Sequence, residues 1–147
     1  MTKFSAAGLP LSPIFSITNI TRNRERYLTG ALASIGLTLA EWRALRIMHS
    51  FAEAIPMGVL IAHSQTDRSA LGRTVDRLVQ RGWVERIPDS NDKRAFLVRK
   101  LSSADEIFER AFQLVGAFDA TLQVALTPEE RAVLSGALEK IERLSDQ

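Results

Sequence analysis

Apolar residues recur at intervals of three and four along much of the chain, which is the spacing of an amphipathic helix. Residues 13–35 carry such a stripe, with Ser12 and Pro13 typical of a helix start and Gly36 typical of its end. The segment Thr38–Glu41 has the pattern of a capping box, which opens a second apolar stripe. The first third of the chain is therefore predicted to form two successive helices.

The middle of the chain changes from helical to alternating spacing. A short helix is predicted over 58–64, and residues 66–67 provide a cap for a helix that ends before Gly82. Two short runs rich in β-branched and aromatic residues follow, at 83–87 and 96–101. Polar, turn-forming residues separate the two runs, so we predict a hairpin with a charged tip.

Two further capping patterns, Ser103 to Glu106 and Thr127 to Glu130, predict two more helices. A helix-turn-helix followed at once by a hairpin has the element order of a winged helix-turn-helix. We therefore predict a mainly α fold with a small β-wing. Its expected parts are a flexible N-terminal arm at 1–12, a winged helix-turn-helix DNA-binding domain at 37–102, and a helical dimerisation region at 13–36 and 103–147.

Charge is unevenly distributed along the chain, although its net value is only +2. Residues 1–65 carry a net +3, residues 66–101 carry +4 and residues 102–147 carry −5. A basic centre suits a polyanionic partner such as nucleic acid.

Composition excludes several other classes of protein. The chain has no cysteine, which rules out disulfides and thiol-based sensing, and its two histidines lack neighbours for a metal site. No apolar run reaches the length of a membrane span, and the N-terminus lacks the pattern of a secretion signal. We expect a cytoplasmic protein with no metal, cofactor or membrane partner.

The helix predicted over 67–81 places apolar and polar side chains on opposite arcs. One arc holds Leu71, Val75, Leu78 and Val79. The opposite arc holds Ser69, Gly72, Arg73 and Asp76. The first turns of such a helix can enter the major groove, where an arginine can donate two hydrogen bonds to guanine. We predict a recognition helix, with Arg77 and Arg81 placed for phosphates, although a solvated surface helix would show the same two arcs.

The hairpin after this helix favours DNA recognition over the surface-helix interpretation. Its tip carries Lys93 and Arg94 at the end of a ribbon thin enough to reach an adjacent minor groove. A charged loop alone is common, but a charged loop directly after a basic helix is more specific.

These segments resemble the multiple-antibiotic-resistance-regulator (MarR) family. Residues 76–86 carry Asp-Arg-Leu followed by Gly-Trp-Val-Glu-Arg, residues 91–94 read Asn-Asp-Lys-Arg, and residues 37–45 are similar to the family's second-helix entry. The resemblance covers nearly the whole chain from Pro13. It implies a two-fold dimer of the first, fifth and sixth helices, pseudo-palindromic operators, and release by small phenolic or aromatic-acid ligands.

The resemblance also implies roles for individual residues. Arg68, Ser69, Gly72 and Arg73 match the family's major-groove surface, Arg94 matches its wing-tip arginine, and Asp92 matches the acid that orients this arginine. The predicted DNA-binding set is Arg68, Ser69, Gly72, Arg73, Arg77, Asp92, Lys93 and Arg94.

Two departures from the family pattern stand out. Gly72 replaces a frequent Thr or Ser, which removes one hydroxyl contact. Residues 99–102 carry one extra residue where the second wing strand meets the next helix, which predicts a bulge at this junction.

Polar residues interrupt two apolar stripes and suggest an effector site. Arg46 and His49 share an arc with Trp42, and Arg24 interrupts the stripe of the first helix. Cations inside an apolar stripe can bind a carboxylate, and the family's pocket lies between these helices and the DNA-binding lobe. The same side chains could instead lie at the edge of each stripe and reach water, or pair with acids of the C-terminal segment.

We therefore expect a sequence-specific DNA-binding transcriptional regulator, a repressor that acts as a homodimer on palindromic operators and is released by a small aromatic ligand. Dimerisation is predicted from apolar residues that one small winged-helix core cannot cover: Ile14, Ile17, Leu122, Leu126, Val133, Leu134, Leu138 and Ile141. An enzyme is not expected, because the chain lacks nucleophile–base pairs and phosphate loops. The alternative is a winged-helix protein-interaction module that does not bind DNA; Arg73 and Arg94 together argue against it.

Overall fold

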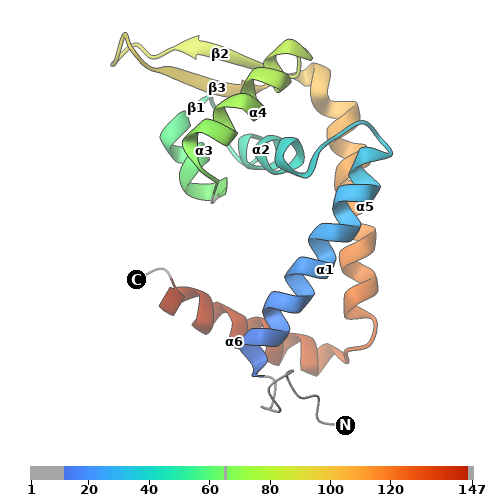
Figure 1. Ribbon diagram of the computed structural model, residues 1–147. Coiled ribbons are helices and arrows are strands. Elements are labelled where there is room, and N and C mark those ends of the chain that lie inside the picture. The colour runs from blue at the N-terminus through green and yellow to red at the C-terminus, as the bar shows by residue number, and fades with distance from the viewer. Residues whose placement is uncertain (1–11, 65, 146–147) are drawn as a thin grey trace. The chain divides into compact units, whose positions relative to one another are not determined.

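The computed structural model describes residues 12–64 and 66–145 (Figure 1). The chain forms two compact units, Met1–Ala111 and Phe112–Gln147. The predicted N-terminal arm lies outside the described residues, apart from Ser12.

The first two helices begin where their capping residues predict. In α1 (Pro13–Ala33), the Ser12 hydroxyl accepts a hydrogen bond from the Phe15 backbone N–H at 3.2 Å. In α2 (Leu39–His49), Thr38 and Glu41 make both bonds of the capping box. Between the two helices, Gly36 adopts a φ of +78°, a left-handed conformation that glycine accepts without strain. Both predicted helices are confirmed.

The helix-turn-helix continues with α3 (Met57–Ser64) and α4 (Arg68–Gln80). The Asp67 carboxylate accepts a hydrogen bond from the Ala70 backbone N–H at 2.9 Å, which fixes the start of α4. Gly82, at a φ of +71°, redirects the chain from α4 into the first wing strand. These boundaries match the sequence-based prediction.

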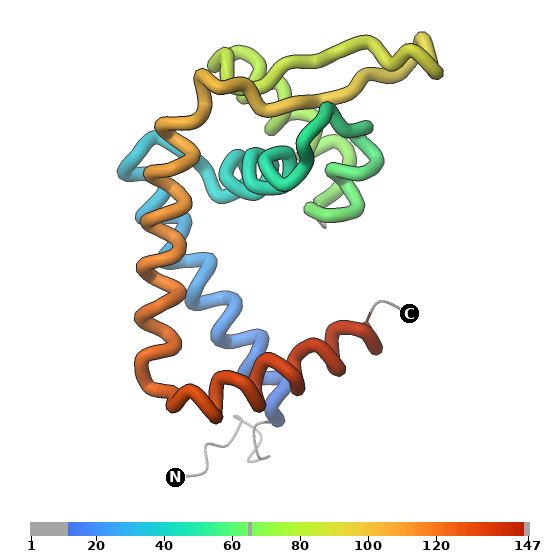
Figure 2. The backbone as a smooth tube through the Cα atoms, turned by 180° about the vertical axis from the view of Figure 1, so that it is seen from behind, coloured from blue at the N-terminus to red at the C-terminus, as the bar shows by residue number. Residues whose placement is uncertain are grey.

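The sheet has three antiparallel strands, β1 (Ile55–Pro56), β2 (Val84–Pro88) and β3 (Phe96–Lys100), in the order β1-β3-β2. The two wing strands run side by side in both views of the chain (Figure 2). The predicted bulge is wrong, because β2 and β3 pair one residue to one from Val84–Lys100 to Pro88–Phe96. Leu101 extends this ladder by donating to the Trp83 carbonyl at 2.8 Å.

The chain then makes one 3-10 turn (Ser102–Ala104) before α5 (Asp105–Gln123). The capping box predicted from Ser103 to Glu106 is wrong. Ser103 lies inside the 3-10 turn, and its hydroxyl donates to the carbonyl of Gly82 rather than capping α5. This bond joins the end of the wing to the turn that follows α4.

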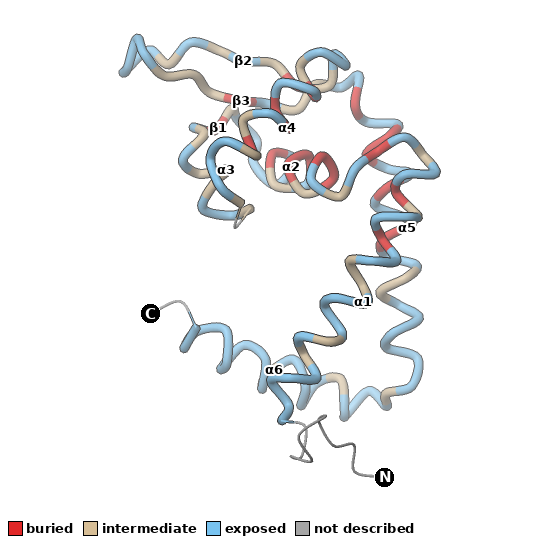
Figure 3. The backbone as a smooth tube through the Cα atoms, viewed as in Figure 1, coloured by how far each residue is buried: buried red, intermediate tan, exposed pale blue. Residues whose placement is uncertain are grey.

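The core of the first unit surrounds α2, which contacts α1, α3, α4 and β3. Buried residues are frequent along α2, and further buried residues lie on the elements that it contacts (Figure 3). The largest fully buried side chains are Leu28, Leu32, Leu37, Leu45, Leu60, Leu78, Val75, Val84 and Val98. Phe108, near the start of α5, adds an aromatic contact, with its ring 5.3 Å from that of Trp42. The first unit thus includes α1 and the start of α5 as well as the winged helix.

The second unit holds the rest of α5 and the whole of α6 (Pro128–Ser145). Thr127 and Glu130 form the predicted capping box of α6. No residue of α6 is buried, and its trace is almost entirely exposed (Figure 3). The exposed apolar side chains of this unit include Phe112, Leu122, Val133, Leu134, Leu138, Ile141 and Leu144.

The predicted fold class, mainly α with a small β-wing, is confirmed. No helix in the described part of the chain is long and apolar enough to cross a membrane.

Candidate nucleic-acid interface

The exposed face of α4 is formed by the residues predicted for it. Arg68, Ser69 and Arg73 are exposed, whereas Leu71 and Val75 on the other side of the helix are buried. Gly72 lies within this face, and a Cβ atom built there would have no neighbour within 4 Å. The first turns of α4 therefore present a shallow basic surface with room for close approach of a ligand.

The wing tip is a tight turn that projects beyond the helices of the first unit (Figure 1). The Asp89 backbone N–H donates to the Ala95 carbonyl at 3.2 Å and closes the turn. The Asp92 carboxylate accepts a hydrogen bond from the Arg94 backbone N–H at 2.9 Å, and no ion pair joins the two side chains within the described residues. Asp92 thus positions Arg94 through its backbone and leaves the guanidinium exposed, like that of the neighbouring Lys93.

A buried carboxylate contacts the C-terminal half of α4. The Glu41 side chain is only 3% exposed and lies 3.6 Å from Arg77 Nε and 3.4 Å from Arg81 Nη1. The Arg77 guanidinium also donates to the Thr74 hydroxyl at 3.2 Å, and the Arg81 guanidinium stacks 3.8 Å from the centre of the Trp83 ring. Arg77, predicted to contact a phosphate, is therefore turned toward α2.

Sequence reasoning missed the second role of Glu41. The capping box alone accounts for a glutamate at this position, so the sequence offers no reason to look for further partners. Its arginine partners lie 36 and 40 positions later in the chain, beyond the range of local sequence patterns. The i, i+4 spacing of Arg73, Arg77 and Arg81 was the only available signal, because residues four apart share a helix face.

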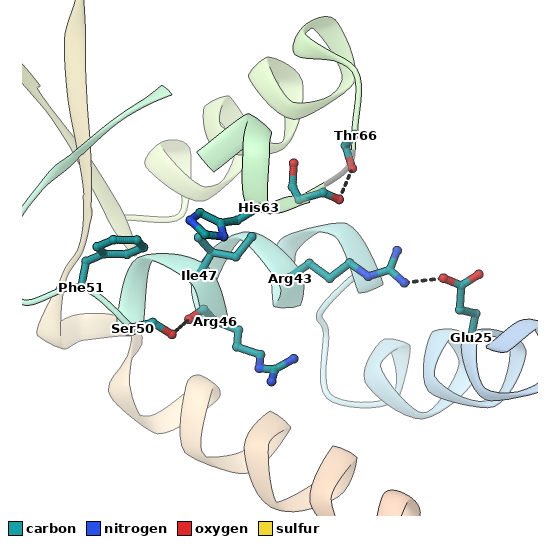
Figure 4. A pocket seen from close by; sticks show the side chains of 9 residues that line it. Glu25, Arg43, Arg46, Ile47, Ser50, Phe51, His63 and Thr66 are labelled. Carbon is teal, nitrogen blue, oxygen red and sulfur yellow. Dashed lines mark hydrogen bonds and ion pairs between the residues drawn. The ribbon is translucent and has the colours of Figure 1, made fainter. Parts of the chain in front are cut away.

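A cavity of about 560 Å³ opens between α1, α2 and α3 (Figure 4). Its polar lining includes Arg43, which is paired with Glu25, and Arg46, which has no ion-pair partner among the described residues. The rings of Phe51 and His63 form its aromatic part, with their centroids 5.9 Å apart.

The residues predicted for an effector occupy different places. Arg46 lines the cavity. Trp42 is 4% exposed and packs in the core, whereas His49 is exposed and stacks on Phe108 with a centroid distance of 4.1 Å. Arg24 lies half-buried on α1 outside the cavity lining. The structure thus places only one of the four in the cavity, and the effector site stays a prediction.

The family model described as "MarR family" matches residues 35–95, from the turn before α2 to the wing tip. The multiple antibiotic resistance protein MarR of Escherichia coli (strain K12) is 34% identical over 134 residues, which cover 90% of this chain and 91% of that protein. The chain belongs to the MarR family. MarR proteins are transcriptional regulators rather than enzymes, in agreement with the expectation from the sequence.

Further relatives and solved structures extend the comparison. The uncharacterized HTH-type transcriptional regulator YdcH of Bacillus subtilis (strain 168) is 28% identical over 141 residues, which cover 94% of each chain. The crystal structure of wild-type E. coli MarR in its apo form superposes with a TM-score of 0.77 at 33% identity, covering 89% of this chain and 96% of that one. The crystal structure of a mutant of E. coli MarR in complex with operator DNA superposes with a TM-score of 0.74 at 35% identity, covering 85% of this chain and 89% of that one.

Proposed function

We propose that this MarR-family chain is a sequence-specific DNA-binding repressor of transcription, acting in the cytoplasm. The exposed face of α4 carries the proposal, because the small residues Ser69 and Gly72 lie beside Arg73, whose exposed side chain has no ion-pair partner among residues 12–64 and 66–145. Arg73 is the residue proposed to donate two hydrogen bonds to guanine, and Arg68 and Ser69 are proposed to contact the adjoining phosphates and bases. The likeness to an E. coli MarR mutant in complex with operator DNA supports this proposal.

The wing contributes cations beside this helix. Lys93 and Arg94 are exposed at the tip, and Asp92 holds the backbone that carries them. We assign them to an adjacent minor groove, where the narrow width of A·T-rich DNA concentrates negative potential. Arg77 is left out of the contact set because its guanidinium is engaged by Glu41 and Thr74.

Homodimerisation is proposed from the apolar side chains that a single chain leaves exposed. They lie on α1 and throughout the second unit, where α6 buries none of its residues. An uncovered apolar stripe along a whole helix is typical of an interface between subunits. A two-fold dimer fits a palindromic operator with half-sites about one helical turn apart.

A small aromatic carboxylate is the effector that the cavity suits best. Arg46 offers a cation without an ion-pair partner in the described part of the chain, and Phe51 and His63 offer ring surfaces against which an aromatic ligand can stack. Benzoate is the simplest probe of this class. It should weaken operator binding by a coupling of about 1 to 3 kcal/mol, and Arg46→Ala should remove the response. A response that persists in Arg46→Ala places the effector elsewhere.

DNA binding itself separates this function from the alternative, a winged-helix module that binds only proteins. Genomic fragments retained by the purified protein are sequenced, and the enriched sequence is titrated against a scrambled duplex by fluorescence anisotropy. We expect enrichment of a palindrome and tighter binding to it than to the scrambled duplex. Equal, weak binding to all fragments would contradict the proposal and favour the protein-interaction module.

A further inference from the structure

Glu41 is a buried carboxylate with more partners than its capping role requires. Its Oε2 accepts the Thr38 backbone N–H at 2.9 Å, which completes the capping box. The same oxygen lies 3.4 Å from Arg81 Nη1, and Oε1 lies 3.6 Å from Arg77 Nε. A carboxylate removed from water needs such partners, because an unpaired buried charge is costly.

The two arginines continue the ridge of α4 that begins with Arg73. Arg77 and Arg81 follow it at intervals of four residues, and their side chains remain 48% and 37% exposed. Side chains this exposed, on the helix assigned to DNA, would be able to reach phosphates if they were free. Instead, both guanidinium groups are held toward α2 by the two carboxylate oxygens of Glu41. The Thr74 hydroxyl also contacts Arg77, and the Trp83 ring contacts Arg81.

We propose that Glu41 is a specificity-determining positioning residue that withholds Arg77 and Arg81 from DNA phosphates and so suppresses binding to non-operator DNA. The inference rests on the proposed DNA-binding function. Phosphate contacts provide nearly all of the sequence-independent affinity, whereas base contacts such as that of Arg73 provide discrimination. When one internal anion holds two cations, it therefore lowers the affinity for non-operator DNA, which depends almost entirely on phosphate contacts, more than it lowers the affinity for the operator.

The salt dependence of binding measures this effect directly. Each additional phosphate contact steepens the slope of log K against log[salt] by about 0.9. Glu41→Gln keeps an acceptor for the Thr38 N–H, since glutamine also completes a capping box, and removes the charge that holds the arginines.

The experiment titrates full-length wild type and Glu41→Gln with operator and scrambled duplexes between about 50 and 200 mM salt, the range in which phosphate contacts dominate affinity. For Glu41→Gln on scrambled DNA we expect about tenfold tighter binding and a slope steeper by about one to two contacts. The ratio of operator to scrambled affinity should fall. Adding Arg77→Gln and Arg81→Gln to this variant should restore the wild-type slope.

The outcomes separate the two proposals. A wild type that binds no DNA overturns the proposed function. A wild type that prefers its operator, together with an unchanged slope in a folded Glu41→Gln, overturns the present inference and leaves Glu41 a structural cap. If Glu41→Gln does not fold, Arg77→Gln provides the test: it should leave the slope on scrambled DNA unchanged, and a slope shallower by about one contact overturns the inference.

Discussion

Asp76 on α4 forms an ion pair with Arg86 on β2. The Arg86 guanidinium also lies 4.8 Å from the centre of the Phe96 ring on β3, so one side chain of β2 contacts both α4 and the other strand of the wing. Asp76 and Arg77 are adjacent in the chain and lie about 100° apart around the helix axis, so Arg86 and Glu41 contact different flanks of α4. The helix is therefore anchored to the wing on one side and to α2 on the other.

The Asp76–Arg86 pair should contribute little to stability, because both side chains are substantially exposed. We expect a coupling of about 0.2 to 1 kcal/mol between Asp76→Asn and Arg86→Gln in the free energy of unfolding. Urea denaturation of the wild type, both single variants and the double variant measures it. Strictly additive effects would mean that the pair does not tie the helix to the wing.

Arg73→Ala and Arg94→Ala should weaken DNA binding in different ways. Loss of a bidentate guanine contact at Arg73 should cost about 1 to 3 kcal/mol, mostly on the operator. Loss of Arg94 should lower affinity across many sequences, and most for sites with A·T-rich flanks. Titration of both variants against operator and scrambled DNA checks the difference, with thermal melts as the control for folding. Unchanged operator affinity in both variants would contradict the proposed contacts of Arg73 with base edges and of Arg94 with the minor groove.

Gly72→Ala should stabilise the protein and weaken operator binding. An added Cβ has free space in the middle of α4, and alanine is favoured over glycine in a helix by about 0.5 to 1 kcal/mol. The same methyl group should hinder the close approach of DNA to this face.

Gly82→Ala is the matched control for this substitution. It places the same methyl group at a φ of +71°, where alanine costs about 1 to 2 kcal/mol. Urea denaturation should therefore show opposite signs for the two variants. A Gly72→Ala protein that binds the operator as tightly as wild type would mean that DNA does not approach this face closely.

If the chain forms the proposed homodimer, Leu138→Lys should convert it to a monomer. Leu138 belongs to the uncovered apolar stripe of α6, and a charge in such an interface would have to be buried without a partner. Ala132→Lys makes the same change of charge on another side of α6 and should leave the dimer intact. Sedimentation velocity at micromolar concentration distinguishes these outcomes, and a monomeric wild type would contradict dimerisation.

Most helix boundaries could be predicted from the sequence because helix caps act over three or four residues. Ser12, Thr38 and Asp67 all accept the backbone bonds that their positions predict. Ser103 did not follow this pattern, because its hydroxyl bonds to Gly82, which lies 21 residues earlier and becomes a neighbour only in the folded wing. Strand β1 was missed because two residues are too short for an alternating pattern.

The buried or exposed state of a candidate site residue was predictable where it depends only on the position of that residue around one helix. The period of α4 was sufficient to assign Leu71 to the core and Arg73 to the surface. The environment of Trp42 was not predictable in this way, because it depends on contact with Phe108, 66 positions later in the chain. The orientation of Arg77 likewise depends on Glu41, which belongs to another helix.

The uncovered stripe of α6 lies in a unit that contains no residue of α4 or of the wing. The proposed dimer contacts of α6 and the proposed base contacts of α4 therefore lie in different parts of the chain. A substitution in one part can abolish its function without affecting that of the other. A chain carrying Arg73→Ala should still form dimers with wild-type chains. Such mixed dimers should bind only one half-site of the operator through base contacts, so the wild-type chains in them can no longer bind a whole operator. In a cell that makes both proteins, such an allele should be genetically dominant, whereas an allele that prevents pairing should be recessive.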